Sequence, residues 1–536
     1  MIRDPIREGL ASGWRVTDAA GLERDLTLEA DVAIVGTGAG GGVTADILTA
    51  AGLDVVMIEE GPLKSSTDFR MLEAEAYPQL YQESAARKTL DKAITILQGR
   101  CVGGSTTVNW TSSFRPPEPT LAFWRERFGL GGLTTEAFAP WLARMEQRLG
   151  IGPWTVAANE NNAALARGAA RLGIATAAIP RNVQGCWNIG YCGMGCPTNA
   201  KQSMLVTTIP AALARGARLV CSARAERLAL HRGRAATLEC AALDGPGVRT
   251  TGKRVRVRAK HYVAAAGAIG SPALLIRSGA PDPYRTLGRR TFLHPTVISA
   301  AVMPHRVEGH AGAPQTVFSD HFLEQAAVDG PIGFKLEVPP LHPALFGMTL
   351  PGIGAPHAAL MELFPHAQVL IALLRDGFHP ASRGGIVGLR ADGSPVLSYP
   401  LTPVLWDAVR RALLAMAEIQ FAAGAKQILP VHERARPYSS WPEAREAIEA
   451  LPLEPLLTRV VSAHVMGGCG MAGAPRRGVV DAGGRHFFLE NVSVHDGSVF
   501  PTSLGTNPQL TIYALAARNA SALAAELTGR APPPIG

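Results

Sequence analysis

The feature that most constrains the fold is a run of glycines that follows a short apolar segment near the N-terminus. Residues 31–35 (Asp-Val-Ala-Ile-Val) predict a buried strand, and Gly-Thr-Gly-Ala-Gly-Gly follows at residues 36–41. Residues 42–48 then begin a helix in this interpretation, and residues 54–58 predict a second strand that ends at Glu59. A strand, a glycine-rich turn, a helix, a strand and an acidic residue in this order are typical of a dinucleotide-binding α/β domain.

The chemistry of a pyrophosphate accounts for these residue types. Gly36 permits the tight turn, Gly38 lets a pyrophosphate approach the backbone, and Gly41 lets the helix pack on the strand. The N-terminus of the helix presents free N–H groups and a positive dipole end to the phosphates. Glu59 can accept hydrogen bonds from ribose hydroxyls. The motif predicts a dinucleotide cofactor, but it does not by itself choose between NAD and FAD.

Length and composition restrict the class of protein. The chain has 536 residues, of which 47% are apolar and 18% charged, as in a globular protein with more than one folding unit. Its net charge of +8 comes from scattered basic residues, without the stripe that a nucleic-acid surface requires. The charged first five residues and the absence of a long apolar run predict neither a signal peptide nor a spanning helix. We expect a cytoplasmic protein that binds no nucleic acid, with export alongside a signal-bearing partner left open.

Further short motifs follow the first one in order along the chain. Gly-Arg-Cys-Val-Gly-Gly-Ser-Thr-Thr-Val-Asn stands at residues 99–109, and Gly-Ala-Ile-Gly-Ser-Pro-Ala-Leu-Leu-Ile-Arg-Ser-Gly at residues 267–279. Ser-Ala-His-Val-Met-Gly-Gly-Cys occupies residues 462–469. Val-His-Asp-Gly-Ser at 494–498 and Gly-Thr-Asn-Pro at 505–508 complete the set. Together they resemble the glucose–methanol–choline (GMC) FAD-dependent oxidoreductases, and the third motif is similar to its version in cholesterol oxidase and long-chain alcohol oxidase.

The resemblance implies an α/β fold with two domains. A Rossmann-like FAD-binding domain would be assembled from residues 25–110, 206–289 and 456–536. A second, α+β substrate-binding domain would be inserted as residues 111–205 and 290–455. In this family the second glycine-rich segment runs under the flavin ring and pyrophosphate, where glycine permits close approach of the backbone. The cofactor-binding residues that the resemblance implies are Gly36, Gly38, Gly41, Glu59, Gly103, Gly104, Asn109, Asp496, Gly497, Asn507 and Pro508.

The resemblance also implies a catalytic pair. Alcohol oxidation requires removal of a hydroxyl proton and transfer of a hydride from the same carbon, and flavin N5 can accept the hydride. His464 would be the base or hydrogen-bond partner at the substrate hydroxyl, and Asn507 would orient the substrate oxygen. Asp496 would bond the cofactor, and His495 before it is interpreted as structural. The predicted reaction is oxidation of an alcohol to an aldehyde or ketone.

The apolar segment at residues 341–374 bears on the substrate. It contains a single formally charged residue, Glu362, and four prolines that prevent one long helix. An apolar substrate pocket, a membrane-touching lip or a buried core all suit this composition. Residues 336–339 are similar to a segment of long-chain alcohol oxidases, which places Glu337 either at the site or on the surface. We expect an apolar or long-chain alcohol.

Three of the seven cysteines crowd into the loop at residues 186–196, namely Cys186, Cys192 and Cys196. The loop resembles one found in long-chain alcohol oxidases and in FAD-dependent sugar dehydrogenases of electron-transfer complexes, where three such cysteines in some cases hold a [3Fe–4S] cluster. A disulfide with a spare thiol and a reduced loop are the alternatives. The other cysteines are expected to be buried free thiols, namely Cys101, Cys221, Cys240 and Cys469.

Three alternatives to an apolar-alcohol oxidase stay open. With a cluster, the protein would be a dehydrogenase subunit acting on a sugar or polyol and passing electrons to a partner such as a cytochrome. Without one, oxygen and a quinone are equally open as acceptors. The other two alternatives are a hydroxynitrile lyase, which keeps FAD without redox turnover, and a fatty-acid photoenzyme.

Overall fold

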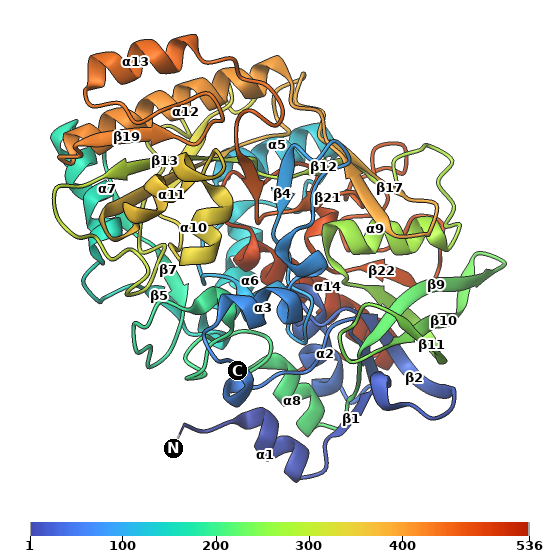
Figure 1. Cartoon of the computed structure of the whole chain (residues 1–536). Coiled ribbons are helices and arrows are strands. Elements are labelled where there is room, and N and C mark those ends of the chain that lie inside the picture. Colours follow the sequence, from blue (N-terminus) through green and yellow to red (C-terminus); the bar gives the residue numbers. More distant parts are fainter. Residues whose placement is uncertain (1, 534–536) are drawn as a thin grey trace.

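The first of two eight-stranded sheets carries the predicted dinucleotide motif. The computed structural model describes residues 2–533, and Figure 1 shows its sheets with helices packed around them. The strand order of the first sheet is β1 (Arg15–Asp18), β8 (Arg218–Cys221), β3 (Val55–Ile58), β2 (Leu26–Val35), β11 (Thr250–Ala264), β10 (Arg234–Leu243) and β9 (Ala223–His231), and β22 (Val492–Val494) also pairs with β11.

The centre of this sheet is parallel and buried. Strands β1, β8, β3, β2 and β11 pair in parallel, and β22 joins β11 in the same direction. Residues 32–35 and 55–58 are buried throughout, because helices and loops cover both faces of a parallel sheet. Strands β10 and β9 return antiparallel at one edge. The predicted α/β fold with a Rossmann-like core is confirmed.

The helix after the glycine turn begins earlier than the sequence predicts. α2 spans Ala39–Ala50, with Gly38 as its N-cap, so the glycines at 40–42 lie inside the helix. A Cβ on Gly40 would lie 1.5 Å from the carbonyl oxygen of His495, and one on Gly42 would lie 2.8 Å from Met204 Cβ. Gly40 is needed because the start of the helix packs directly on the backbone of His495, and Gly42 because the helix packs closely on the Met204 side chain.

Helices from distant parts of the chain surround α2. They include α6 (Thr135–Arg148), α8 (Thr208–Ala214) and α14 (Gln509–Thr528); α14 packs on both α2 and α6, and α8 packs on α2. Inside α2, the buried Asp46 carboxylate binds Arg148 at 3.0 Å and Arg215 at 2.6 Å. This ion cluster joins α2 to the ends of α6 and α8, and loss of the carboxylate would leave two guanidinium groups uncompensated.

The second eight-stranded sheet is built mainly from the later part of the chain. Its strand order is β4 (Ile94–Ile96), β20 (Val460–Ser462), β13 (Thr296–Val302), β16 (Ala367–Leu374), β15 (Phe334–Glu337), β14 (Val317–Ser319) and β6 (Ala177–Ala178), and β19 (Gln427–Pro430) also pairs with β13. α7 (Glu160–Arg171) and α13 (Trp441–Ala450) pack on α12 (Pro403–Ala422), which covers β13 and β16 (Figure 1).

Smaller elements complete the architecture. One sheet has the order β18 (Pro395–Ser398), β17 (Gly385–Leu389), β12 (Arg289–Phe292), β21 (Met466–Gly467), and β5 (Ile151–Pro153) pairs with β7 (Pro180–Asn182). The remaining helices are α1 (Pro5–Ala11), α3 (Glu73–Leu80), α4 (Ser105–Val108), α5 (Glu118–Phe128), α9 (Gly267–Arg277), α10 (Pro343–Thr349) and α11 (Ala355–Glu362). Within residues 2–533, no helix combines the length and apolar character needed to cross a bilayer.

The two sheets bear on the proposed division into domains. β4 and β20 lie in the second sheet, although residues 25–110 and 456–536 are otherwise assigned to the cofactor domain. Both strands lead directly into predicted site motifs, at residues 99–109 and 462–469. The second glycine-rich cofactor segment and the predicted catalytic segment therefore both start from the sheet that would hold the substrate.

Candidate active site

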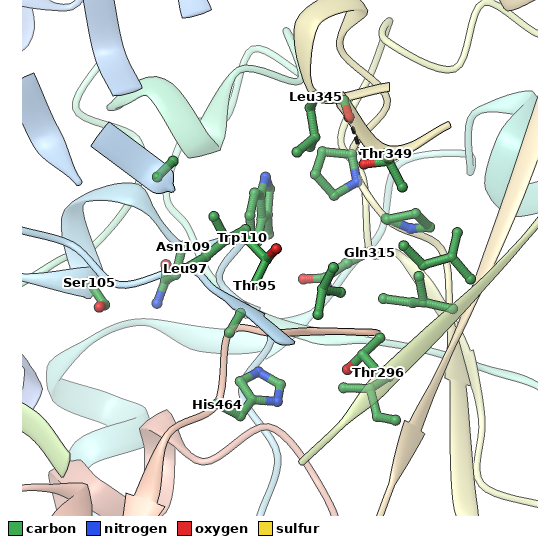
Figure 2. Close-up of a pocket in the computed structure, with 18 of the residues that line it drawn as sticks. Thr95, Leu97, Ser105, Asn109, Trp110, Thr296, Gln315, Leu345, Thr349 and His464 are labelled. Atoms are coloured by element: carbon green, nitrogen blue, oxygen red, sulfur yellow. Dashed lines mark hydrogen bonds between the residues drawn. The ribbon is translucent and has the colours of Figure 1, made fainter. Parts of the chain in front are cut away.

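A cavity of about 540 Å³ joins the glycine turn to the second sheet. Ala39 and Ser105 lie at one end of it, and the α10 residues Leu345 and Thr349 line the other. His464 and Asn507 line the wall between these ends. Figure 2 shows the His464 ring projecting into the space, with Ser105 and Asn109 on one side and Leu345 and Thr349 at the far end. Residues predicted from motifs far apart in the sequence thus border one cavity.

The two glycine-rich segments meet at the cofactor end of the cavity. Gly36 has a φ of +96°, and a Cβ on Gly41 would lie 1.9 Å from the Gly36 carbonyl oxygen. Gly104 has a φ of +54°, and its Cβ would lie 2.7 Å from Gly38 Cα. By contrast, a Cβ on Gly38 would find no atom nearer than 3.9 Å. The space beside Gly38, next to a helix N-terminus without a side-chain cap, fits a pyrophosphate.

Glu59 is buried beside the same turn, with 7% of its surface exposed. Its Oε2 accepts hydrogen bonds from the Thr37 amide at 3.1 Å and the Thr37 hydroxyl at 2.6 Å, and its Oε1 accepts from the Gly61 amide at 3.0 Å. Burial raises the pKa of Glu59, and these hydrogen bonds oppose that rise. A carboxylate has about four acceptor positions, so capacity for a ribose hydroxyl remains.

The predicted catalytic histidine has a second histidine beside it. His464 lies between β20 and β21, and its Nδ1 is 3.0 Å from Nδ1 of His294, which follows β12. Burial lowers the pKa of His464 to about 3, with a smaller contribution from the Lys335 charge. Burial also lowers the pKa of His294 well below its ordinary value. Both rings are therefore neutral at neutral pH, and His294 is a site residue that the sequence did not indicate.

Asn507 lies just before the N-terminus of α14, and a buried hydrogen-bond network holds its side chain. Its Nδ2 donates to Glu337 Oε2 at 3.3 Å, and the same oxygen accepts from Gln315 Nε2 at 3.0 Å. Lys335 Nζ lies 3.4 Å from Glu337 Oε1. Glu337 is fully buried at the end of β15, so the alternative that placed it on the surface was wrong. Gln315 and Lys335 were not found by sequence reasoning.

The other predicted cofactor residues occupy more varied positions. Asn109 and Pro508 line the cavity, and Gly103 donates its amide to the Thr37 hydroxyl at 3.0 Å. Asp496 Oδ2 accepts from the Gly267 amide at 2.8 Å and the Ser271 hydroxyl at 2.5 Å. Gly497 begins the short helix η6 (Gly497–Val499). Within the structure, Asp496 therefore joins the start of α9 to η6, and its bond to a cofactor stays a prediction.

His495, which the sequence interpretation assigned a structural role, lies against α2. Its Nδ1 is 3.0 Å from the Thr44 hydroxyl. The ring is buried, and its surroundings lower its pKa to about 3 chiefly through desolvation. The hydrogen bond to α2 supports the structural interpretation.

None of the residues 186–196 of the cysteine loop lines the cavity. Cys186 Sγ accepts from the Asn188 amide at 3.4 Å, and Cys192 Sγ accepts from Arg181 Nη2 at 3.7 Å. In residues 2–533, no three His, Cys, Asp or Glu side chains are grouped to hold a metal ion. The three cysteines, including Cys196, therefore do not fit the predicted cluster. The expectation of buried free thiols is confirmed for Cys101, Cys221, Cys240 and Cys469.

Comparison with known proteins agrees with this architecture. The GMC oxidoreductase family matches residues 77–296 with its N-terminal part and residues 380–516 with its C-terminal part. A GMC-type oxidoreductase of Sinorhizobium fredii is 30% identical over 502 residues, covering 94% of this chain and 96% of that protein. The long-chain-alcohol oxidase FAO4A of Arabidopsis thaliana is 28% identical over 511 residues, covering 92% and 68%.

Solved structures share the fold at lower identity. The pyridoxine 4-oxidase of Mesorbium loti superposes with a TM-score of 0.65 at 20% identity and covers 91% of this chain and 98% of its own. A variant of the Aspergillus oryzae formate oxidase, studied for its FAD modification, gives a TM-score of 0.66 at 16% identity, with 93% and 99% covered. The chain belongs to the GMC oxidoreductase family. It is an enzyme of the FAD-dependent flavoprotein class.

Proposed function

We propose that the enzyme oxidises an apolar alcohol to an aldehyde or ketone, with His464 as the proton acceptor and Asn507 as the group that orients the substrate oxygen. The observation that carries this proposal is a neutral imidazole and a carboxamide on one wall of an otherwise largely apolar cavity. A neutral imidazole can accept a hydroxyl proton, and a carboxamide can hydrogen-bond the oxygen as negative charge develops on it.

The hydrogen bond of His464 determines which nitrogen receives the proton. Its Nδ1 is engaged by His294, so Nε2 is the nitrogen left for the substrate hydroxyl. FAD, when bound at the glycine turn, supplies the acceptor for the hydride that leaves the same carbon. The hydroxyl proton passes to His464, and the remaining electron pair of the O–H bond forms the carbonyl. Proton transfer to His464 and hydride transfer to FAD both require the substrate carbon to lie between His464 and the cofactor end of the cavity.

The far end of the cavity favours an apolar chain. Alternate residues of β16, Val369, Ile371 and Leu373, face the cavity, as period-two geometry requires. Phe346 and Leu350 add apolar surface from α10 and its C-cap. Several sugar hydroxyls would be left without partners against this wall, which favours an apolar alcohol over a polyol. The named activity of the Arabidopsis relatives, long-chain-alcohol oxidation, supports the same class.

The test is to record the flavin spectrum of the FAD-loaded enzyme without oxygen, before and after adding alcohols of increasing chain length. We expect bleaching by an apolar alcohol in the dark. His464→Ala should retain FAD and lose the bleaching, while His305→Ala, at an exposed histidine bonded to Glu160, should behave as wild type. A flavin that no alcohol bleaches in the dark would favour the lyase or the photoenzyme. Reoxidation by oxygen or by a quinone then identifies the acceptor.

A further inference from the structure

We propose that the buried ion pair of Lys335 and Glu337 is a positioning device that fixes the orientation of the Asn507 carboxamide. The inference rests on the proposed function, because it assigns Asn507 to the substrate oxygen. It concerns two residues that do not line the cavity and act only through the residues that do.

The first step is the isolation of the pair from water. Lys335 and Glu337 are two residues apart on β15 and therefore project from the same face of the strand. Their side chains are 2% and 0% exposed. The Lys335 ammonium also lies over the ring of Phe114, 2.9 Å from its centroid, and 4.4 Å from that of Phe318. Two charges are thus enclosed in a low-dielectric region, where their mutual attraction is stronger than it would be in water.

The second step is the acceptor character of the carboxylate. Burial raises the pKa of Glu337, and the Lys335 charge and the hydrogen bond from Asn507 oppose that rise and favour the ionised form. The ionised carboxylate can only accept hydrogen bonds, so both carboxamides at Glu337 Oε2 turn their NH₂ groups toward it. For Gln315 the rest of the network agrees, because its Oε1 accepts from the Ser112 hydroxyl at 3.0 Å. For Asn507 the same rule fixes the amide with Nδ2 toward Glu337. A neutral group at position 337 can donate as well as accept, and it would permit the opposite orientation.

The third step is what this orientation leaves for the substrate. Within residues 2–533, Asn507 Oδ1 is buried and has no hydrogen-bond partner. One N–H of the same carboxamide is also not used by Glu337. Lys335 strengthens the arrangement from the other side, because its Nζ donates to the Thr506 hydroxyl at 3.0 Å, directly before Asn507. The pair therefore holds both the side chain of Asn507 and the side chain of the preceding residue, Thr506.

The fourth step is energetic. A buried ion pair is often no more stabilising than an apolar or neutral pair of the same size, whereas loss of one partner leaves an uncompensated charge. Stability alone therefore does not account for this pair in the middle of a sheet. An orienting role does account for it, because only the charged form dictates which atom of each carboxamide faces Glu337.

The experiment compares wild type with Glu337→Gln, Lys335→Met and the double variant. Two quantities are measured: the thermal midpoint of the cofactor-free protein, and the rate of flavin reduction by an alcohol in the FAD-loaded enzyme without oxygen. Each single variant should melt several degrees lower than wild type, and the double variant should recover most of that loss. The reduction rate of the double variant should nevertheless stay about 10- to 100-fold low, with KM within about threefold of wild type.

Recovery of the reduction rate together with the thermal midpoint would overturn the proposal, because the pair would then be structural only. A wild-type rate in Glu337→Gln would overturn it as well. If no alcohol reduces the wild-type flavin, the proposed function fails, and a second measurement decides the inference. The thermal midpoints of Glu337→Gln, Asn507→Leu and their double variant should be non-additive. Additive shifts would show that Glu337 does not hold Asn507.

Discussion

The imidazoles of His464 and His294 meet with their Nδ1 atoms 3.0 Å apart. Between two neutral rings, one Nδ1 carries the hydrogen and the other accepts it. Only the state in which His464 donates leaves its Nε2 as a free acceptor for a substrate proton. In that state His294 keeps its hydrogen on Nε2, which is buried and has no partner within residues 2–533. In the other state the same Nε2 is an unpaired acceptor, so His294 keeps a buried nitrogen without a partner in either tautomer, at a cost of about 1–3 kcal/mol.

Replacing His294 should impair catalysis without removing the cofactor. In His294→Phe the Nδ1 hydrogen of His464 loses its acceptor, and the imidazolium formed during turnover loses a stabilising hydrogen bond. We expect the rate of flavin reduction to fall about 10- to 100-fold, as for other residues that orient a reactive histidine. Rapid-mixing spectroscopy without oxygen measures the rate, and the flavin-to-protein absorbance ratio reports FAD content. A wild-type rate would mean that His294 does not set the tautomer.

The activity should persist to unusually low pH. Burial lowers the pKa of His464 to about 3, so the ring stays neutral where an ordinary imidazole, with a pKa near 6.5, is protonated. Its ability to accept a proton is then present above the lowered pKa and is lost as the pH falls through it. We expect kcat/KM to show no acid limb between pH 7 and about pH 5. An acid limb centred near pH 6.5 would contradict this assignment.

The length of the alcohol's carbon chain should control kcat/KM until the cavity is filled. Each methylene transferred from water to an apolar wall contributes about 0.8 kcal/mol, or about fourfold in kcat/KM. We expect this increment along a series of straight-chain primary alcohols, followed by a plateau. Ile371→Asn should reduce the increment, because Ile371 lines the apolar end. Steady-state kinetics across the series makes the measurement, and equal efficiency for short and long alcohols would exclude the apolar assignment.

Gly38→Ala should separate folding from cofactor binding. Gly38 has an ordinary φ of −68°, and an added Cβ would make only an ordinary van der Waals contact, 3.9 Å from Gly104 Cα. The cofactor-free variant should therefore melt as wild type does, while its methyl group occupies the space assigned to the pyrophosphate. We expect FAD affinity to fall at least about tenfold, or about 1.4 kcal/mol, by fluorescence titration. Gly21→Ala, where the added Cβ meets no atom within 4 Å, is the matched control.

A buried histidine in the first sheet should make the fold sensitive to acid. His261 on β11 is 3% exposed and bonded to the Ser493 hydroxyl, and desolvation lowers its pKa to about 3. Below pH 6.5 the unfolded chain takes up a proton that the folded protein does not, so stability falls as the pH falls. By pH 5 this group should cost about 2 kcal/mol. Urea unfolding of cofactor-free His261→Gln at pH 7 and pH 5 should show a correspondingly smaller loss than wild type.

The sequence predicts the cofactor turn well because glycine is demanded there by backbone geometry. Residues 31–41 and 99–109 predicted close approach of a cofactor to two glycine-rich segments, and the structure brings Gly38 and Gly104 of these segments together. The position of His464 and Asn507 on one cavity followed from the family resemblance. These features are local, so short motifs are sufficient to indicate them.

The surroundings of the predicted catalytic pair were beyond the reach of sequence reasoning. Residues 334–338, Phe-Lys-Leu-Glu-Val, alternate apolar and charged side chains, which normally indicates a strand with one face in water. Here β14 and β16 flank the strand and both faces are covered, so the charges of Lys335 and Glu337 are buried. His294 gave no periodic signal at all. Alternation of apolar and charged residues indicates that the two faces of a strand differ. It does not indicate whether the polar face contacts solvent or another polar segment.

The packing of Gly40 against His495 has a consequence for how the enzyme is made. The helix that presents its N-terminus to the cofactor closes on backbone that is synthesised more than 450 residues later. Asn507 and α14 emerge later still, and α14 packs on α2. A nascent chain on the ribosome therefore carries the first glycine turn for most of its synthesis without the surface that completes it. We therefore expect the capture of FAD to wait for the last part of the polypeptide, so that an unfinished chain carries no flavin.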